Sequence, residues 1–196
     1  MNLVEVKRIS YYPPSKGYAV LLQEKDSNRS LPIIVGTAEA QAIALYLEGV
    51  NMPRPMTHDL FVNLMDSIDT EINRVTIARM TNGTFFAEVE VSNPNIGEFV
   101  LDSRPSDAVA LALRTSSEIY VSDEVMERAS NDEDMSNDNK EIHHRVSSEE
   151  LMKEPTEEML LENLNEALEK AILEEEYEVA ARLRDRIKQL EKKSTS

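Results

Sequence analysis

Residues 74–91, with the sequence RVTIARMTNGTFFAEVEV, carry the strongest local structural signal in this chain. Two runs rich in β-branched and aromatic residues, which favour strands, flank Thr81-Asn82-Gly83-Thr84. Asn-Gly readily adopts the two positive φ angles of a type I′ turn. The stretch therefore predicts a β-hairpin with strands over residues 74–80 and 85–91.

Outward from this hairpin, strand and helix patterns mix without strict alternation. An i, i+3, i+4, i+7 apolar stripe predicts a helix over residues 40–47, a second helix begins at Thr57 with its hydroxyl as N-cap, and a third begins at Pro105. Further strands are predicted over residues 3–11, 18–23, 31–35, 99–101 and 119–121. This order is typical of an α+β domain, a mixed sheet with packed helices.

The chain divides into three segments by composition. Residues 1–130 form the predicted α+β domain, residues 131–155 an acidic flexible linker, and residues 156–193 a helical segment with two apolar stripes. Periodicity alone does not distinguish one long helix from a hairpin in the last segment. About 40 residues cannot build a large core, so this segment is expected to pair with another copy or a partner.

Composition limits the class of protein. The 196 residues include no cysteine and carry a net charge of −16, and all three segments are acidic. There is no thiolate metal site, no apolar run long enough to span a bilayer and no signal-peptide core, so we expect a cytoplasmic protein without membrane contact. Any nucleic-acid contact must come from local arginines working against the overall field.

Two polar turns repeat one pattern before apolar helices. They run from Pro53 to Asp59 and from Asp102 to Asp107, and each combines an Arg-Pro step, a hydroxyl residue and an aspartate in the first helical turn. Arginine binds phosphate through two parallel hydrogen bonds, and histidine moves protons near neutral pH. If the turns meet in space, they predict a site for phosphodiester hydrolysis.

The candidate residues fall into two sets. The predicted catalytic set is Arg54, His58, Asp59, Arg104 and Asp107. Carboxylates suited to Mg²⁺ or another divalent cation are Glu39, Asp59, Asp102 and Asp107. Each has a structural alternative, because first-turn aspartates stabilise helix N-termini and the arginines could simply pair with them.

The front domain resembles the bifunctional nuclease (BFN) family. The matching pieces are residues 31–36, 39–43, 53–59 and 104–108, in that order. The resemblance implies DNase and RNase activity, although a domain can keep its fold and lose its chemistry. DNA or RNA preference, the need for metal and the oligomeric state stay open, and a homo-oligomer is expected.

The last segment resembles the UVR motif, which occurs in bacterial excision-repair proteins and several chaperone-associated proteins. The match rests on Glu-Tyr-Glu followed by Ala-Ala-Arg-Leu-Arg-Asp over residues 176–185. It implies an α-helical hairpin used for protein–protein contact, with partner-binding residues Tyr177, Ala181, Arg182, Leu183, Arg184 and Asp185. An alternative function is therefore a non-catalytic, oligomeric adaptor that recruits a repair or protein quality-control partner.

Overall fold

The computed structural model describes residues 1–12, 17–27, 29–131, 146–152 and 184. The chain separates into two compact units, Met1–Leu151 and Met152–Ser196, and the fold below is that of the first unit. Its elements are β1 (Asn2–Tyr12), β2 (Gly17–Glu24), β3 (Ser30–Val35), α1 (Thr37–Leu47), α2 (Thr57–Ser67), β4 (Glu71–Thr81), β5 (Thr84–Asn93), β6 (Gly97–Ser103), α3 (Pro105–Thr115), β7 (Glu118–Val121), α4 (Asp123–Asn131) and α6 (Ser148–Met152).

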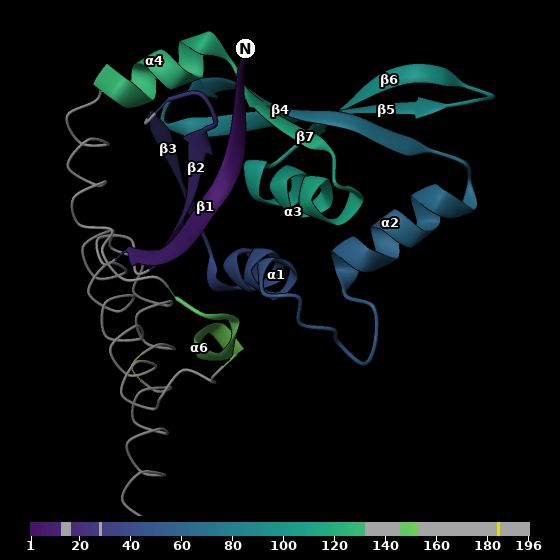
Figure 1. Cartoon of the computed structure of the whole chain (residues 1–196), viewed down its shortest axis with the longest axis horizontal. Coiled ribbons are helices and arrows are strands. Elements are labelled where there is room, and N and C mark those ends of the chain that lie inside the picture. The colour runs from purple at the N-terminus through teal and green to yellow at the C-terminus, as the bar shows by residue number, and fades with distance from the viewer. Residues whose placement is uncertain (13–16, 28, 132–145, 153–183, 185–196) are drawn as a thin grey trace, which may run out of the picture. The chain divides into compact units, whose positions relative to one another are not determined.

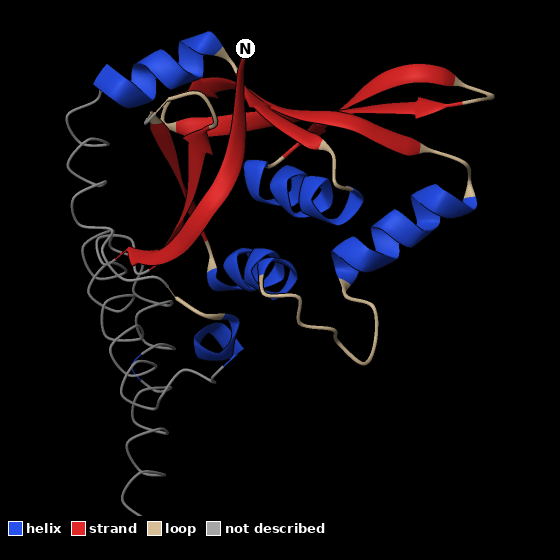
Figure 2. Ribbon diagram, in the orientation of Figure 1, coloured by secondary structure: helices blue, strands red, loops and turns tan. Residues whose placement is uncertain are grey.

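One seven-stranded sheet organises the unit, with strand order β3-β2-β1-β7-β4-β5-β6 (Figure 1). Neighbouring strands are antiparallel except β4 and β7, which pair in parallel. Figure 2 shows the helices packed around this sheet, so the predicted α+β class with a mixed sheet is confirmed. No helix in the part of the chain that the structure describes is long and apolar enough to cross a membrane.

The hairpin predicted from residues 74–91 is present as β4 and β5. Asn82 and Gly83 have φ angles of 51° and 75°, and Thr81 pairs directly with Thr84. These two positive angles are those expected of the Asn-Gly turn. The turn chemistry therefore fixes the register of the two strands.

Helix α3 is the central helix of the unit. It packs against α1, α2, β4 and β5, and residues 108–112 are all buried, as their uniformly apolar sequence predicts. Pro105 lies in the first turn, where its missing N–H costs nothing, and Ser116 ends the helix with a φ of 57°. Helix α4 packs against β3 and β4 and contributes Val125 and Met126 to the same core.

Helix α2 begins differently from the prediction. Its N-cap is Met56 rather than Thr57, and the Asp59 carboxylate accepts the Met56 backbone N–H at 2.8 Å. A carboxylate at the third helical position can satisfy this N–H in the manner of a capping box, so the Thr57 hydroxyl is not needed. The N-cap prediction was wrong by one residue.

Residues 146–151 lie inside the segment that was predicted to be a linker, yet they belong to the first compact unit. The Val146 N–H donates to the Ile9 carbonyl at 3.0 Å, and the Glu48 carboxylate accepts the Ser148 N–H at 3.0 Å and the Ser148 hydroxyl. Val146 and Leu151 are buried in the core. The compact unit therefore extends to Leu151 rather than ending at residue 130.

Most of the predicted helical hairpin lies outside the described residues. This holds for Tyr177, Ala181, Arg182, Leu183 and Asp185. Arg184 is described, and it is helical and exposed. The hairpin over residues 156–193 stays a prediction.

Candidate active site

The two polar turns meet in space. His58 from the first turn of α2 and Asp107 from the first turn of α3 are 49 positions apart in sequence, and His58 Nε2 lies 3.1 Å from Asp107 Oδ1. An ionised carboxylate only accepts hydrogen bonds, so this contact requires the proton on Nε2. The imidazole is thereby oriented by the aspartate, and Nδ1 remains as its second nitrogen.

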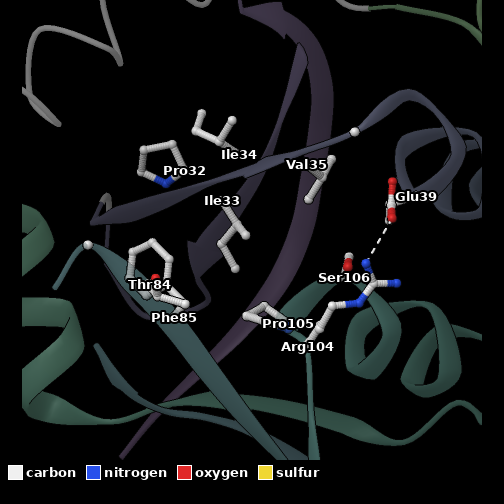
Figure 3. Close-up of a pocket in the computed structure, with 12 residues that line it drawn as sticks. Pro32, Ile33, Ile34, Val35, Glu39, Thr84, Phe85, Arg104, Pro105 and Ser106 are labelled. Carbon is white, nitrogen blue, oxygen red and sulfur yellow. Dashed lines mark hydrogen bonds and ion pairs between the residues drawn. The ribbon is translucent and has the colours of Figure 1, made fainter. Parts of the chain in front are cut away.

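Arg104 joins the same cluster from the N-cap of α3. Its Nε and Nη2 atoms donate to the two Asp107 oxygens at 2.8 and 3.2 Å, and its Nη1 donates to Glu39 Oε1 at 3.0 Å (Figure 3). The fork of the guanidinium matches both carboxylates, which fixes its plane. The Arg104 side chain is nonetheless 66% exposed, so the group is held in place while it faces solvent.

The charge of Asp107 follows from these contacts. Partial burial raises the pKa of its carboxyl, but the hydrogen bonds from Arg104 and His58 outweigh burial and hold the pKa below its usual range. The pKa of Arg104 is raised, chiefly by its hydrogen bond to Asp107. Asp107 is therefore ionised at neutral pH and serves as a hydrogen-bond acceptor for both neighbours.

A cavity of about 390 Å³ opens beside Arg104. Figure 3 shows Thr84 and Phe85, at the start of β5, on one side of the cavity, and Arg104 with Glu39 on the other side. The lining residues are Pro32, Ile33, Ile34, Val35, Gly36, Glu39, Gly83, Thr84, Phe85, Arg104, Pro105 and Ser106. Apolar walls with a few polar groups at one end are the usual form of a small-molecule or nucleotide site.

Gly36 allows Glu39 to reach this position. A Cβ added at Gly36 would lie 2.7 Å from Glu39 Oε2, which is closer than side-chain atoms approach one another. Because Oε2 is at the end of a flexible side chain, a substitution at Gly36 would move the carboxylate rather than unfold the helix. The glycine therefore positions one of the two acidic partners of Arg104.

Asp59, the residue next to His58, belongs to a different ion pair. Its Oδ1 lies 2.5 Å from Nε of Arg114, whose side chain is only 7% exposed. Arg114 also donates to the carbonyls of Ala110 and Ala42 and lies 5.7 Å from the centre of the Tyr46 ring. Burial raises the pKa of Asp59, but the bonds from Arg114 and the Met56 N–H hold it below its usual range.

Sequence reasoning missed Arg114. The residue is the only charged side chain between Asp107 and the end of α3, and a charged residue in an otherwise apolar helix is expected to have an ion-pair partner. That partner is Asp59, so this aspartate ties α2 to α3 and caps α2. The contacts of Asp59 therefore favour a structural role, in helix capping and ion pairing, over a catalytic one.

Arg54 and Asp102 do not join the Arg104 cluster. Arg54 is exposed and lines a second cavity of about 400 Å³ together with Asp59 and Arg114, and no hydrogen bond or ion pair fixes it among the described residues. Asp102 is exposed on β6, opposite Glu88 of β5. Arg54 and Arg104 therefore line different cavities, and a clamp of both arginines on one phosphate stays a prediction.

The predicted metal ligands are also distributed over different contacts. Glu39 and Asp107 share Arg104, Asp59 pairs with Arg114, and Asp102 is separate from these contacts. Within the described ranges, no group of three or more histidine or acidic side chains is arranged to hold a metal ion. Three of the four carboxylates, Glu39, Asp59 and Asp107, therefore pair with an arginine.

The sequence that builds this domain matches a known family. Residues 20–134 fit the bifunctional nuclease domain model, and residues 158–193 fit the UvrB/uvrC motif. Because the domain match covers more than half of the chain, the protein belongs to the bifunctional nuclease domain family.

Individual relatives agree with this membership. The chain is 40% identical over 129 residues to an uncharacterized protein of Mycobacterium tuberculosis, found in two strains, and the match covers 66% of this chain and 76% of the relative. It is 29% identical over 104 residues to Bifunctional nuclease 1 of Arabidopsis thaliana, which covers 52% of this chain and 32% of that protein. The match to the plant protein thus involves about a third of its length.

Proposed function

We propose that this protein hydrolyses phosphodiester bonds of DNA and RNA at the Arg104 cluster. The observation that carries the proposal is an exposed guanidinium, fixed by Glu39 and Asp107, at the edge of the cavity and hydrogen-bonded to the same carboxylate as His58. Membership of the bifunctional nuclease domain family supports it, as does the name of the plant relative.

Arg104 supplies the positive charge that a phosphate needs. Two of its nitrogens are held by Asp107 and one by Glu39, so the side chain is already oriented before a ligand arrives. A preoriented donor costs little reorganisation when negative charge develops on the phosphate oxygens. The two carboxylates also reduce the net positive charge, so binding is expected to be weak and to depend on salt concentration.

His58 and Asp107 supply the proton-transfer chemistry. With Nε2–H donated to Asp107, Nδ1 of His58 is the nitrogen that would accept a proton from the attacking water. The ionised Asp107 stabilises the imidazolium that forms and holds the ring in place. The His58 side chain is 16% exposed.

A divalent cation remains part of the proposal to be tested. Glu39 and Asp107 offer oxygen ligands, but both already bind Arg104, so a cation here would have to share or displace the guanidinium. Phosphate binding by Arg104 and proton transfer by His58 do not require this cation. Assays with Mg²⁺ and with EDTA distinguish the two situations.

The test is cleavage of fluorogenic single-stranded DNA and RNA by the purified full chain. Arg104→Ala and His58→Gln are each expected to lower the rate by about 100-fold or more, the range typical of losing a transition-state charge or a general base. Arg79→Ala is the matched control, because this exposed arginine lies over the Phe86 ring and does not line the cavity beside Arg104. Equal rates for the three variants would point to a contaminating nuclease and refute the assignment.

We further propose that the segment matching the UvrB/uvrC motif binds a protein partner. The match over residues 158–193 is the observation that favours this second function, and it is compatible with either an active or an inactive front domain. Pull-downs with the full chain should lose their specific partners when Ala181 and Leu183 are changed to glutamate. Recovery of the same partners by this variant would remove the support for an adaptor role.

A further inference from the structure

Helix α2 presents an apolar face to solvent. Leu60, Phe61, Leu64 and Ile68 follow i, i+1, i+4, i+8 spacing and are all exposed, with Leu60 at 64%, whereas Met65 is the only buried residue of the helix. Residues at this spacing share one side of a helix. An amphipathic helix normally turns such a side to a protein core.

Strand β6 presents an unpaired, apolar sheet edge. It is the last strand of the sheet, and Phe99, Val100 and Leu101 at its centre are all exposed. The opposite edge, β3, is protected in two ways, since it contains Pro32 and packs against α4. Among the described strands, β6 has neither protection, so its free N–H and C=O groups are available for pairing.

The two apolar areas join at Asn93. This buried side chain donates to the Ile68 carbonyl at 2.7 Å and accepts the Ile96 N–H at 3.1 Å, which brings the end of α2 next to the β5–β6 turn. Ile96 is itself 74% exposed. Figure 1 shows α2 and the β5–β6 hairpin at the same end of the unit. The helix face, Ile96 and the edge strand therefore form one surface, here called the α2–β6 surface.

The size of the α2–β6 surface approaches one side of a dimer interface. Side chains alternate along a strand, so Val100 points to the other face of the sheet, and the remaining seven large side chains together expose about three and a half full residues, or roughly 600 Å². The largest apolar patch on a typical monomer is about 300–600 Å², and a stable interface buries about 800 Å² on each partner. The surface is thus at the upper end of what a monomer usually leaves open, and the unpaired β6 edge adds backbone groups that a partner strand can satisfy.

We propose that a second copy of this chain covers the α2–β6 surface, with the two β6 strands paired antiparallel about a two-fold axis. A two-fold axis perpendicular to the sheet makes identical edge strands antiparallel, so one contact satisfies both free edges and closes the assembly. The acidic residues Glu98 and Asp102 flank the apolar centre of β6, which makes a nucleic acid an unfavourable occupant of this surface. The two β6 strands must therefore pair in a register that is not centred on Val100, so that these acids do not lie directly opposite each other. The dimer does not depend on nuclease activity.

The experiment measures the mass of the full chain in solution by light scattering during gel filtration. The expected mass is about twice the 22.2 kDa of the chain. Leu64→Lys and Val100→Lys should each raise the dimer dissociation constant at least about tenfold, since lysine is disfavoured both at an apolar interface and on a pairing edge. Ile34→Lys is the matched control, because Ile34 is an exposed apolar residue on β3, and its dimer should be unchanged.

The cysteine-free sequence allows a second, geometric test. At least one of the single variants Phe99→Cys, Val100→Cys and Leu101→Cys should form a disulfide-linked dimer under mild oxidation, because paired strands bring residues near the axis within bridging distance. Ile34→Cys should not. A monomeric wild-type chain, a dimer that both lysine variants leave intact, or three cysteine variants that fail to cross-link would each overturn the proposal.

Discussion

Replacing Asp59 by asparagine should destabilise the domain far more than its surface position suggests. The change leaves the buried guanidinium of Arg114 without its counter-charge, while the two carbonyl acceptors of Arg114 remain. Breaking a buried ion pair on one side costs about 3–5 kcal/mol, and we reduce this to about 2 kcal/mol because Asp59 is partly solvated. For a domain of this size the loss corresponds to a decrease in Tm of about 4–8 °C.

The variants can separate the two roles of Asp59. Asp59→Ala removes both the counter-charge and the acceptor for the Met56 N–H, so it should cost about 1 kcal/mol more than Asp59→Asn. Asp66→Asn, on the same helix and exposed, is the control and should change the free energy of unfolding by less than about 0.5 kcal/mol. Replacing both Asp59 and Arg114 by apolar residues should restore part of the loss.

The assay is urea and thermal denaturation followed by far-ultraviolet circular dichroism, together with nucleic-acid cleavage by the same samples. A Tm for Asp59→Asn within about 2 °C of wild type would refute the ion-pair reasoning. Complete loss of cleavage in such a stable variant would instead return Asp59 to the catalytic set. A decrease in Tm that is accompanied by a matching decrease in cleavage rate supports the structural role.

Three other perturbations have defined outcomes. Because the pKa of Asp107 is lowered in the folded state, stability is retained above the usual carboxyl pKa and lost as pH falls through the folded value, so Asp107→Asn should flatten the urea-derived stability profile below about pH 5. Glu48→Gln weakens the charged hydrogen bonds that hold Ser148 on the first unit, so trypsin cleavage beside residues 146–152 should accelerate about fivefold. The control Glu149→Gln should leave the cleavage rate unchanged. Gly83→Ala strains a φ of 75° and should cost about 1 kcal/mol in urea denaturation, whereas Asn82→Gly should be close to neutral.

Local patterns predicted the elements of this fold because each is decided by neighbouring residues. The Asn82-Gly83 turn and the apolar body of α3 are examples, and both are present as expected. The strand order could not be predicted in this way. Strands β4 and β7 pair in parallel, although β5, β6 and α3 lie between them in the sequence. No local propensity encodes which non-adjacent strands pair, so the sheet topology could not be read from the sequence.

The candidate site was partly predictable for the same reason. The repeated Arg-Pro turns indicated that His58, Arg104 and Asp107 belonged together, and their contacts agree with this. The roles of Arg54 and Arg114 depended on three-dimensional placement, because the Asp59–Arg114 pair spans 55 positions in sequence. Residues 146–152 were missed since their two buried side chains, Val146 and Leu151, make too short a pattern to stand out in a polar segment.

The β4–β5 turn is also a wall of the cavity beside Arg104, through Gly83, Thr84 and Phe85. Hairpins can gain or lose residues at their tips in pairs while the paired strands below keep their alternation. Family members could therefore lengthen or shorten this hairpin tip to admit larger or smaller ligands, with the proposed catalytic cluster on α2 and α3 left unchanged. Ligand choice and chemistry would then evolve as separate modules, and exchanging the tip between homologues would be a direct route to altered selectivity.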